Sequence, residues 1–215
     1  MDLAGNVTTQ TYAGEVDKIA PALNITTKPA TVMDAYTLSW TVSDENLATV
    51  TANGQSVAAK NGSLVITPSG ADGARTIKVV ATDKAGNSTE KSVTMTYDVR
   101  PKITTSGKGI YYRYANWGAG NKEYLSISGL ASSKPISIIN ASINSYPEYK
   151  FSGQTAFMSE WHSYSLSRDL QNASAREITG QVTFNIEYLT ELNTKGTVTL
   201  TVNMRSCDGS MYCPE

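Results

Sequence analysis

The sequence predicts an all-β protein. Ser and Thr make up close to a quarter of the 215 residues, and threonine favours strands. Apolar and polar residues alternate in many short runs, such as "TLSWTVS", "TIKVVAT", "SVTMTYD", "VTFNIEY" and "VTLTVNM". That alternation is the period of antiparallel strands with one buried face. Many short strands separated by turn signals are typical of sandwiches or barrels, and no convincing stretch of helical period and length interrupts them.

Composition excludes several classes of partner. The net charge is −1 and 17% of residues are charged, so the basic footprint of a nucleic-acid-binding protein is missing. One histidine and two cysteines cannot supply the four ligands of a common structural zinc site. No run of 18 apolar residues occurs, and we therefore expect no membrane insertion. Residues 1–20 contain no apolar core of a signal peptide.

An internal repeat predicts the domain organisation. The segment "DLAGNVT" at residues 2–8 returns as "DKAGNST" at residues 83–89, about 81 residues later. Similarity at a fixed spacing is the mark of a tandem array. We therefore interpret residues 1–17 as the last strand of a preceding repeat and residues 18–98 as one full repeat. On this interpretation the chain begins inside a domain and has neighbouring repeats in a longer protein.

Three segments of the full repeat carry a family pattern: "DKIAPALNIT" at 17–26, "TVSDENLATVTANGQSV" at 41–57 and "IKVVATDKAGNSTEKSVTMTYD" at 77–98. On these segments, residues 18–98 resemble the bacterial immunoglobulin-like (Ig-like) repeats of secreted and cell-surface proteins. The resemblance implies an antiparallel Ig-like β-sandwich in an extracellular, secreted or cell-surface protein. The pattern predicts that its core includes Leu38, Trp40, Val42, Ile77 and Val79.

The resemblance also raises the question of calcium, because some such arrays hold calcium with aspartates at domain junctions. Asp17 and Asp98 are the first candidates by position, followed by Asp44 and Asp83. The alternative is that each Asp caps its own turn and needs no ion, and the absence of a dense Asp-x-Asp-x-Asp run favours this alternative. Beyond a possible structural calcium, no cofactor is expected.

Residues 99–215 match no family. The number of strands expected in them predicts a second, larger β-sandwich-type domain. This half is rich in aromatic residues and is a candidate recognition head or cap. The only helix that the sequence suggests is a short one at residues 167–175. The last two expected strands form a hairpin. The expected strands cover residues 110–114, 124–128, 136–140, 151–157, 163–166, 181–188 and 197–204.

The segment "GIYYRYANWGAGNKEY" is the candidate ligand site. Aromatic faces near amide and guanidinium groups suit glycans and also suit proteins on a host or cell surface. Because Tyr111 and Tyr112 point to opposite faces of a strand, part of the cluster is expected to be exposed. The alternative is that these aromatics fill the core. The candidate ligand-binding residues are Tyr112, Arg113, Tyr114, Asn116, Trp117 and Tyr124.

Neither the cysteines nor the histidine indicates catalysis. Cys207 and Cys213 enclose "DGSMY", and in an oxidising compartment we expect a local disulfide between them; two free thiols in a reducing cytoplasm are the alternative. His162 is the single histidine, and the Gly-x-Ser-x-Gly signature of a serine hydrolase is missing. The carboxylates of residues 123, 148, 160, 169, 177 and 187 cannot be paired from the sequence. We expect no enzyme activity.

Three functional hypotheses follow. The first is a non-catalytic extracellular binding or adhesion fragment, with an Ig-like stalk unit and a recognition domain. The second is an accessory, carbohydrate-binding region of a secreted carbohydrate-active enzyme. The third is a structural spacer with its cap.

Overall fold

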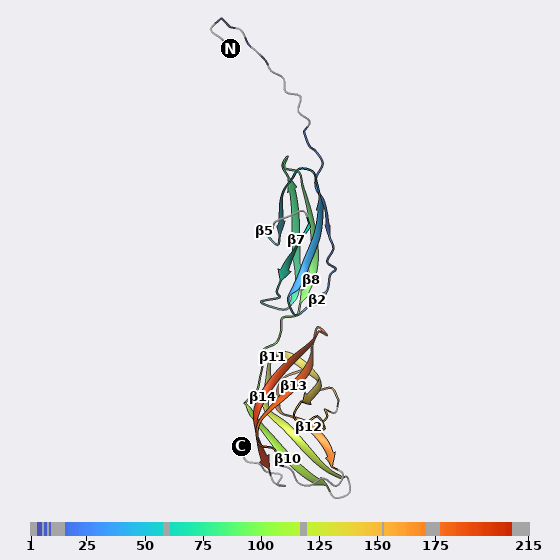
Figure 1. The fold of residues 1–215 in the computed structure, drawn as a ribbon, viewed down its shortest axis with the longest axis vertical. Coiled ribbons are helices and arrows are strands. Elements are labelled where there is room, and N and C mark those ends of the chain that lie inside the picture. The colour runs from blue at the N-terminus through green and yellow to red at the C-terminus, as the bar shows by residue number, and fades with distance from the viewer. Residues whose placement is uncertain are drawn as a thin grey trace. The chain divides into compact units, whose positions relative to one another are not determined.

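The computed structural model describes residues 4–5, 7, 9, 16–57, 61–116, 120–151, 153–170 and 177–207. All the regular structure in these residues is β (Figure 1), which confirms the all-β class. None of them belongs to a helix long and apolar enough to cross a membrane. The strands are β1 (Ala22–Ile25), β2 (Thr31–Val32), β3 (Tyr36–Ser43), β4 (Leu47–Ala52), β5 (Gln55–Val57), β6 (Asn61–Ile66), β7 (Gly73–Asp83), β8 (Ser88–Tyr97), β9 (Ile103–Thr104), β10 (Lys108–Asn116), β11 (Gly120–Ile143), β12 (Met158–Leu170), β13 (Gly180–Thr190) and β14 (Lys195–Cys207).

The chain divides into two compact units. The first contains residues 1–30, 35–67 and 74–96, and the second contains residues 31–34, 68–73 and 97–215. The short segments 31–34 and 68–73 therefore belong to the second unit, although they precede it in the sequence.

The first unit is built from two sheets. One has the strand order β1-β3-β6, and the other contains β8, β7, β4 and β5 in that order. All five residues expected in the core are buried, including Trp40 in β3 and Val79 in β7. Strand alternation therefore predicted the core of this unit correctly, because each of these strands has one buried face.

Two turns of the first unit follow from their residues. Asn53 and Gly54 join β4 to β5 with φ of 51° and 77°, the positive values that a two-residue hairpin turn requires. At the end of β7 the carboxylate of Asp83 accepts hydrogen bonds from the backbone N–H groups of Ala85 (2.8 Å) and Asn87 (2.9 Å). This is the turn-capping role that the sequence suggested for aspartate.

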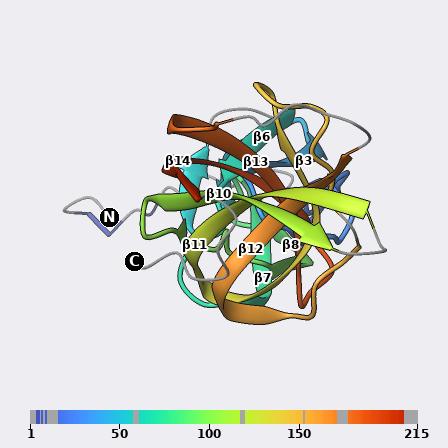
Figure 2. The ribbon, with the colours of Figure 1, turned by 90° about the horizontal axis from the view of Figure 1, so that it is seen from below.

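The second unit contains a single six-stranded sheet that closes on itself. Its order is β10-β14-β13-β11-β12, with β10 also paired to β11 and β9 added to β11. The pairing of β10 with β14 is parallel, whereas β11 pairs antiparallel with its neighbours. These strands can be followed in Figure 1 and, from below, in Figure 2. The closed circuit of pairings surrounds one hydrophobic core, which includes Phe184, Tyr188 and Leu125.

One long strand makes this closure possible. β11 runs for 24 residues: its first part pairs with β10 and β12, and its last part pairs with β13. The register shifts between Ala131 and Ile136 and again between Ile138 and Asn140. Such bulges bend a strand and increase its twist, which lets β11 serve both parts of the sheet. The sequence instead predicted two separate strands, at 124–128 and 136–140.

Two further sequence predictions for the second unit are wrong. The described residues of 151–157 form no strand: Gly153 has a φ of +94°, and the segment is held to β11 only around Gln154 and Thr155, which bond Ser137 and Ile138. Residues 167–170 are the end of β12 rather than a helix, since they continue the register with β11. The remainder of the expected helix, 171–175, lies outside the described residues. The hairpin of β13 and β14 is confirmed.

Each unit places a glycine directly opposite a large buried aromatic residue. Gly62 in β6 faces Trp40, and Gly196 in β14 faces Tyr188. A Cβ atom on Gly62 would lie 2.8 Å from Cζ2 of Trp40, and one on Gly196 would lie 2.4 Å from Cζ of Tyr188. The aromatic rings therefore cover the strand backbone where a side chain would otherwise stand.

Replacing Gly62 by alanine should lower the free energy of unfolding by about 1–3 kcal/mol, the usual cost of overpacking a filled core. Trp40 is buried and cannot move away from the added methyl group. Chemical denaturation of the full chain measures the loss. Ser63→Ala, on the same strand but exposed, is the control and should change stability by less than about 0.5 kcal/mol. An unchanged denaturation midpoint for Gly62→Ala would contradict this account of the core.

Candidate ligand-binding face of the second unit

The strands β10, β11 and β12 have an inner and an outer face. Tyr111, Leu125 and Ile127 belong to the hydrophobic core and define the inner face. Because side chains alternate along a strand, the residues between and beside them point the other way. We call this opposite surface the outer face; its members are Ile110, Tyr112, Tyr124, Ser126, Ser128 and Ser165.

A buried carboxylate joins the three strands on the inner side. Glu123 in β11 has no solvent exposure and accepts hydrogen bonds from the hydroxyls of Tyr111 (2.8 Å) and Tyr149 (2.7 Å). Arg168 in β12 completes the shell, with Nη2 at 2.8 Å from Oε2 of Glu123 and its guanidinium carbon 5.6 Å from the centre of the Tyr149 ring. The charge is therefore paired and hydrogen-bonded, as a buried carboxylate must be.

The ionisation of this cluster follows from its contacts. Burial alone would raise the pKa of Glu123, but the hydrogen bonds from Tyr149 and Tyr111 and the positive charge of Arg168 outweigh it, so the pKa lies below the usual value. Burial and the neighbouring carboxylate raise the pKa of Tyr149. The cluster is therefore an ionised carboxylate held by neutral phenols and a guanidinium.

A preformed aromatic pair lies on the outer face. Tyr112 and Tyr124 are directly opposite each other in the β10–β11 register, and their rings stack with centroids 4.8 Å apart and an interplanar angle of 12°. Both side chains are half-buried. Burial raises the pKa of the Tyr112 hydroxyl, while a side-chain hydrogen bond with Ser165 of β12 acts in the opposite direction. Three strands therefore fix the position of this pair.

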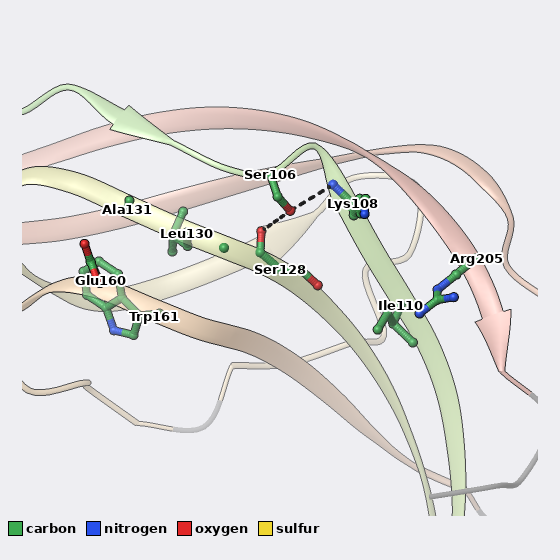
Figure 3. A pocket seen from close by; sticks show the side chains of 10 residues that line it. Ser106, Lys108, Ile110, Ser128, Leu130, Ala131, Glu160, Trp161 and Arg205 are labelled. Carbon is green, nitrogen blue, oxygen red and sulfur yellow. Dashed lines mark hydrogen bonds between the residues drawn. The ribbon is translucent and has the colours of Figure 1, made fainter. Parts of the chain in front are cut away.

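A pocket opens where the alternation of β11 is interrupted. Leu125 and Ile127 face the core, but the next core residue is Leu130 rather than residue 129. Gly129 lies at this change of alternation with a φ of +59°, a backbone conformation that glycine adopts readily. Beside it lies a pocket of about 360 Å³ (Figure 3), within the ~300–1,000 Å³ range of ligand pockets.

The walls of the pocket carry opposite charges. Lys108 of β10 and Arg205 of β14 stand on one side, and Glu160 and Trp161 of β12 stand on the other (Figure 3). Ile110 contributes to the cationic side, where it is opposite Arg205 in the β10–β14 register. The Nε1–H of Trp161 is buried and has no hydrogen-bond partner. The pocket therefore combines two cations, one carboxylate and an indole.

The structure brings together only part of the predicted ligand cluster. Tyr112 and Tyr124 form the stacked pair described above, whereas Trp117 lies outside the described residues. Arg113, Tyr114 and Asn116 belong to β10, but their side chains also lie outside what the structure describes. A ligand role for these residues therefore stays a prediction.

The sequence did not indicate the pocket: of its charged residues only Glu160 was named, as one of several carboxylates without a partner, and the role of Glu123 was missed. A signal for Glu123 was present, since it shares the parity of Leu125 and Ile127 in "KEYLSIS" and so belongs to the apolar side of the strand. No comparable signal marks Lys108 and Arg205, which are brought together by the parallel pairing of two strands far apart in the sequence.

Three of the four calcium candidates, Asp17, Asp44 and Asp83, lie in the first unit and have protein donors. Asp83 accepts the Asn87 side-chain amide at 2.8 Å in addition to its two backbone N–H groups, and these hydrogen bonds outweigh burial and lower its pKa. Asp44 caps its own turn through the N–H of Asn46 at 2.8 Å. Asp17 accepts the side-chain amide of Asn46 at 3.4 Å. An ion would have to displace amide donors at these positions.

Asp98 belongs to the second unit, where its carboxylate forms an ion pair with Lys134. Its buried carboxylate contacts the Lys134 ammonium and the Thr190 hydroxyl, and Lys134 also reaches Asp72 at 2.8 Å. Burial would raise the pKa of Asp98, but its contacts with Lys134 and Thr190 lower it. In the described part of the chain, no three His, Cys, Asp or Glu side chains gather as a cation site. The calcium hypothesis stays a prediction.

The two other chemical candidates are only partly described. Cys207 is buried at the end of β14, and its expected partner Cys213 lies outside the described residues. His162 belongs to β12, but its side chain also lies outside what the structure describes. The expected disulfide stays a prediction.

Replacing Glu123 by glutamine should destabilise the second unit by about 3 kcal/mol at pH 7, because Arg168 loses its buried counter-charge. The folded pKa of Glu123 lies below its ordinary value of 4.5. Its contribution is therefore complete above that value and is lost as the pH falls below it. The stabilities of the native chain and Glu123→Gln should thus converge between pH 7 and pH 3 in urea denaturation.

Other carboxylates titrate in both proteins, so the difference between the two curves isolates Glu123. Glu177→Gln, which removes an exposed carboxylate from the same unit, is the matched control and should change stability little at either pH. A gap between the native chain and Glu123→Gln that is as large at pH 3 as at pH 7 would refute this assignment.

Comparison with known proteins identifies the class of the first unit. Residues 21–99 match the family model described as glucodextranase, domain B. A search of the curated proteins finds no match. Among solved structures, the protocadherin GammaB4 extracellular domain is 17% identical, with 88% of this chain and 34% of that chain covered and a TM-score of 0.33. A putative membrane-anchored protein from Corynebacterium diphtheriae is 12% identical, with 92% and 61% covered and a TM-score of 0.29.

The chain spans only part of its structural neighbours. It covers 34%, 51% and 41% of the length of three of these solved chains, all of which are protocadherin gamma ectodomains. Superpositions at these TM-scores are too loose to assign a function. The family match and the two-sheet architecture agree on one point: residues 21–99 form an Ig-like β-domain.

Proposed function

We propose that this chain is a non-catalytic segment of an extracellular or surface protein, in which an Ig-like β-domain precedes a saccharide-binding domain. The binding surface is the outer face of β10, β11 and β12. The observation that carries the proposal is the stacked, half-exposed pair Tyr112–Tyr124 beside a pocket lined with charged side chains.

The chemistry of this surface suits a sugar. The C–H faces of a pyranose pack on aromatic rings, while its hydroxyls need nearby donors and acceptors. The tyrosine rings, the hydroxyls of Ser128 and Ser165 and the carboxylate of Glu160 supply both. Because the tyrosines are fixed by register and stacking before a ligand arrives, little side-chain entropy is lost on binding.

The family match supports a carbohydrate context. Glucodextranase, by its name, acts on a glucan, and the first unit matches the model of its domain B. This favours an accessory binding region of a carbohydrate-active protein over a spacer without a ligand. Adhesion to a cell through the same surface is the second candidate, because a glycan on a cell surface presents the same chemistry.

Three further features belong to this proposal. We infer from the returning "DxAGN" that residues 1–17 are the last strand of a preceding Ig-like repeat. Cys207 and Cys213 pair after export and fasten the chain beyond β14. A stiffening calcium ion at Asp17, Asp44, Asp83 or Asp98 would compete with the amide and ammonium donors already present.

A glycan array probed with the full chain should identify saccharide ligands, and Tyr124→Ala should weaken the strongest of them by about 2 kcal/mol, as loss of an aromatic anchor does. Tyr124→Phe keeps the ring and should retain most of the binding. Phe157→Ala removes an aromatic residue that is 44% exposed and lies outside the outer face, so it should bind like the native chain.

Two outcomes would overturn the proposal. One is an array without any signal, while a cell-surface protein binds the chain. The other is saccharide binding that Tyr124→Ala leaves unchanged, with the native fold verified by thermal unfolding.

A further inference from the structure

We propose that the pocket beside Gly129 is a subsite for an acidic saccharide, whose carboxylate is held by Lys108 and Arg205. This inference rests on the proposed function and adds the class of sugar. It comes from the arrangement of charges around the pocket rather than from the tyrosine pair.

The two cations are available to a ligand. Lys108 and Arg205 are exposed, line the same pocket and come from adjacent parallel strands. Neither side chain forms an ion pair with any described residue, although seven such pairs occur elsewhere in the described chain. Two neighbouring cations on rigid strands repel each other and gain from an anion placed between them.

The charge balance favours a monoanion. Glu160 stands across the pocket from the two cations (Figure 3), so the three groups carry a net charge of about one positive unit. A phosphate dianion would be repelled by Glu160, whereas a single carboxylate matches the net charge. Glu160 itself can accept hydrogen bonds from hydroxyls on the far side of the same ligand.

The uncharged walls favour a sugar ring over an amino-acid side chain. Ile110, Leu130 and Trp161 form the apolar part of the lining, while Ser128 adds a hydroxyl. The buried Nε1–H of Trp161 lacks an acceptor, which is uncommon for a buried donor. The indole ring of Trp161 therefore serves this wall as an apolar surface.

The geometry of the sheet makes the subsite a rigid one. Lys108 and Arg205 start from strands whose inner residues are core, including the neighbouring Met204. Gly109, between Lys108 and Ile110, has no room for a side chain, since its Cβ would lie 2.2 Å from Sδ of Met204. The backbone beneath the cations is therefore closely packed, and sites on such elements are positioned more precisely than sites on loops.

The test compares two forms of one ligand on the full chain. The probes are a trimer of galacturonic acid and the same trimer with its carboxyl groups methyl-esterified, titrated by calorimetry. The acid should bind at least tenfold more tightly than the ester, and its affinity should fall with added salt. Lys108→Ala and Arg205→Ala should each weaken binding of the acid about tenfold and leave binding of the ester unchanged.

Lys102→Ala is the matched control. It removes one exposed lysine from the same unit and does not line the pocket, so it should bind the acid as the native chain does. If Lys102→Ala and Lys108→Ala lose affinity equally, the attraction is a general charge effect and the subsite is refuted.

The remaining outcomes separate this inference from the proposed function. If the array identifies neutral sugars, and acid and ester bind equally in all variants, the acidic subsite is wrong while saccharide binding stands. If no saccharide of either kind binds, both fail. If a peptide with a free C-terminal carboxylate binds through Lys108 and Arg205 and the sugar acid does not, the pocket recognises a peptide and the inference is overturned.

Discussion

A carboxylate can remain ionised inside a protein only where other groups replace the water it has lost. Glu123 meets this condition by drawing donors from three places in the second unit: Tyr111 on β10, Arg168 on β12 and Tyr149 in the segment after β11. Each of these residues must be at its observed register for the shell to be complete. The arrangement of β10, β11 and β12 therefore depends on this one buried charge as well as on apolar packing.

The register of β10, β11 and β12 around Glu123 also determines the geometry of the outer face. Since side chains alternate, fixing Tyr111 and Glu123 on the inside places Tyr112 and Tyr124 side by side on the outside. The alternation changes at Gly129, which has a positive φ, and the pocket lies next to it. The same strand register therefore positions both the inner and the outer residues, and a shift of that register would move both sets together.

The sequence predicted the first unit better than the second, for physical reasons. In the first unit the strands that carry the core alternate cleanly between buried and exposed residues, so alternation alone identified Trp40 and its neighbours as core. In the second unit β11 is bent by bulges and changes partners along its length. Neither the bend nor the parallel pairing of β10 with β14 has a local signal, because both depend on contacts between distant segments. The charged pocket is a product of that pairing.

The glycines opposite Trp40 and Tyr188 also limit which strand alignments are possible. A slip of two residues preserves the alternation of inward and outward side chains, so hydrophobic patterning by itself does not prevent it. Moving β6 by two residues would set Leu64 in place of Gly62 against Trp40, and moving β14 likewise would set Val198 in place of Gly196 against Tyr188. Neither ring leaves space for a side chain. Each aromatic–glycine pair thus disfavours a misaligned strand pair sterically, and it does so both for neighbouring strands such as β13 and β14 and for strands farther apart in the chain such as β3 and β6.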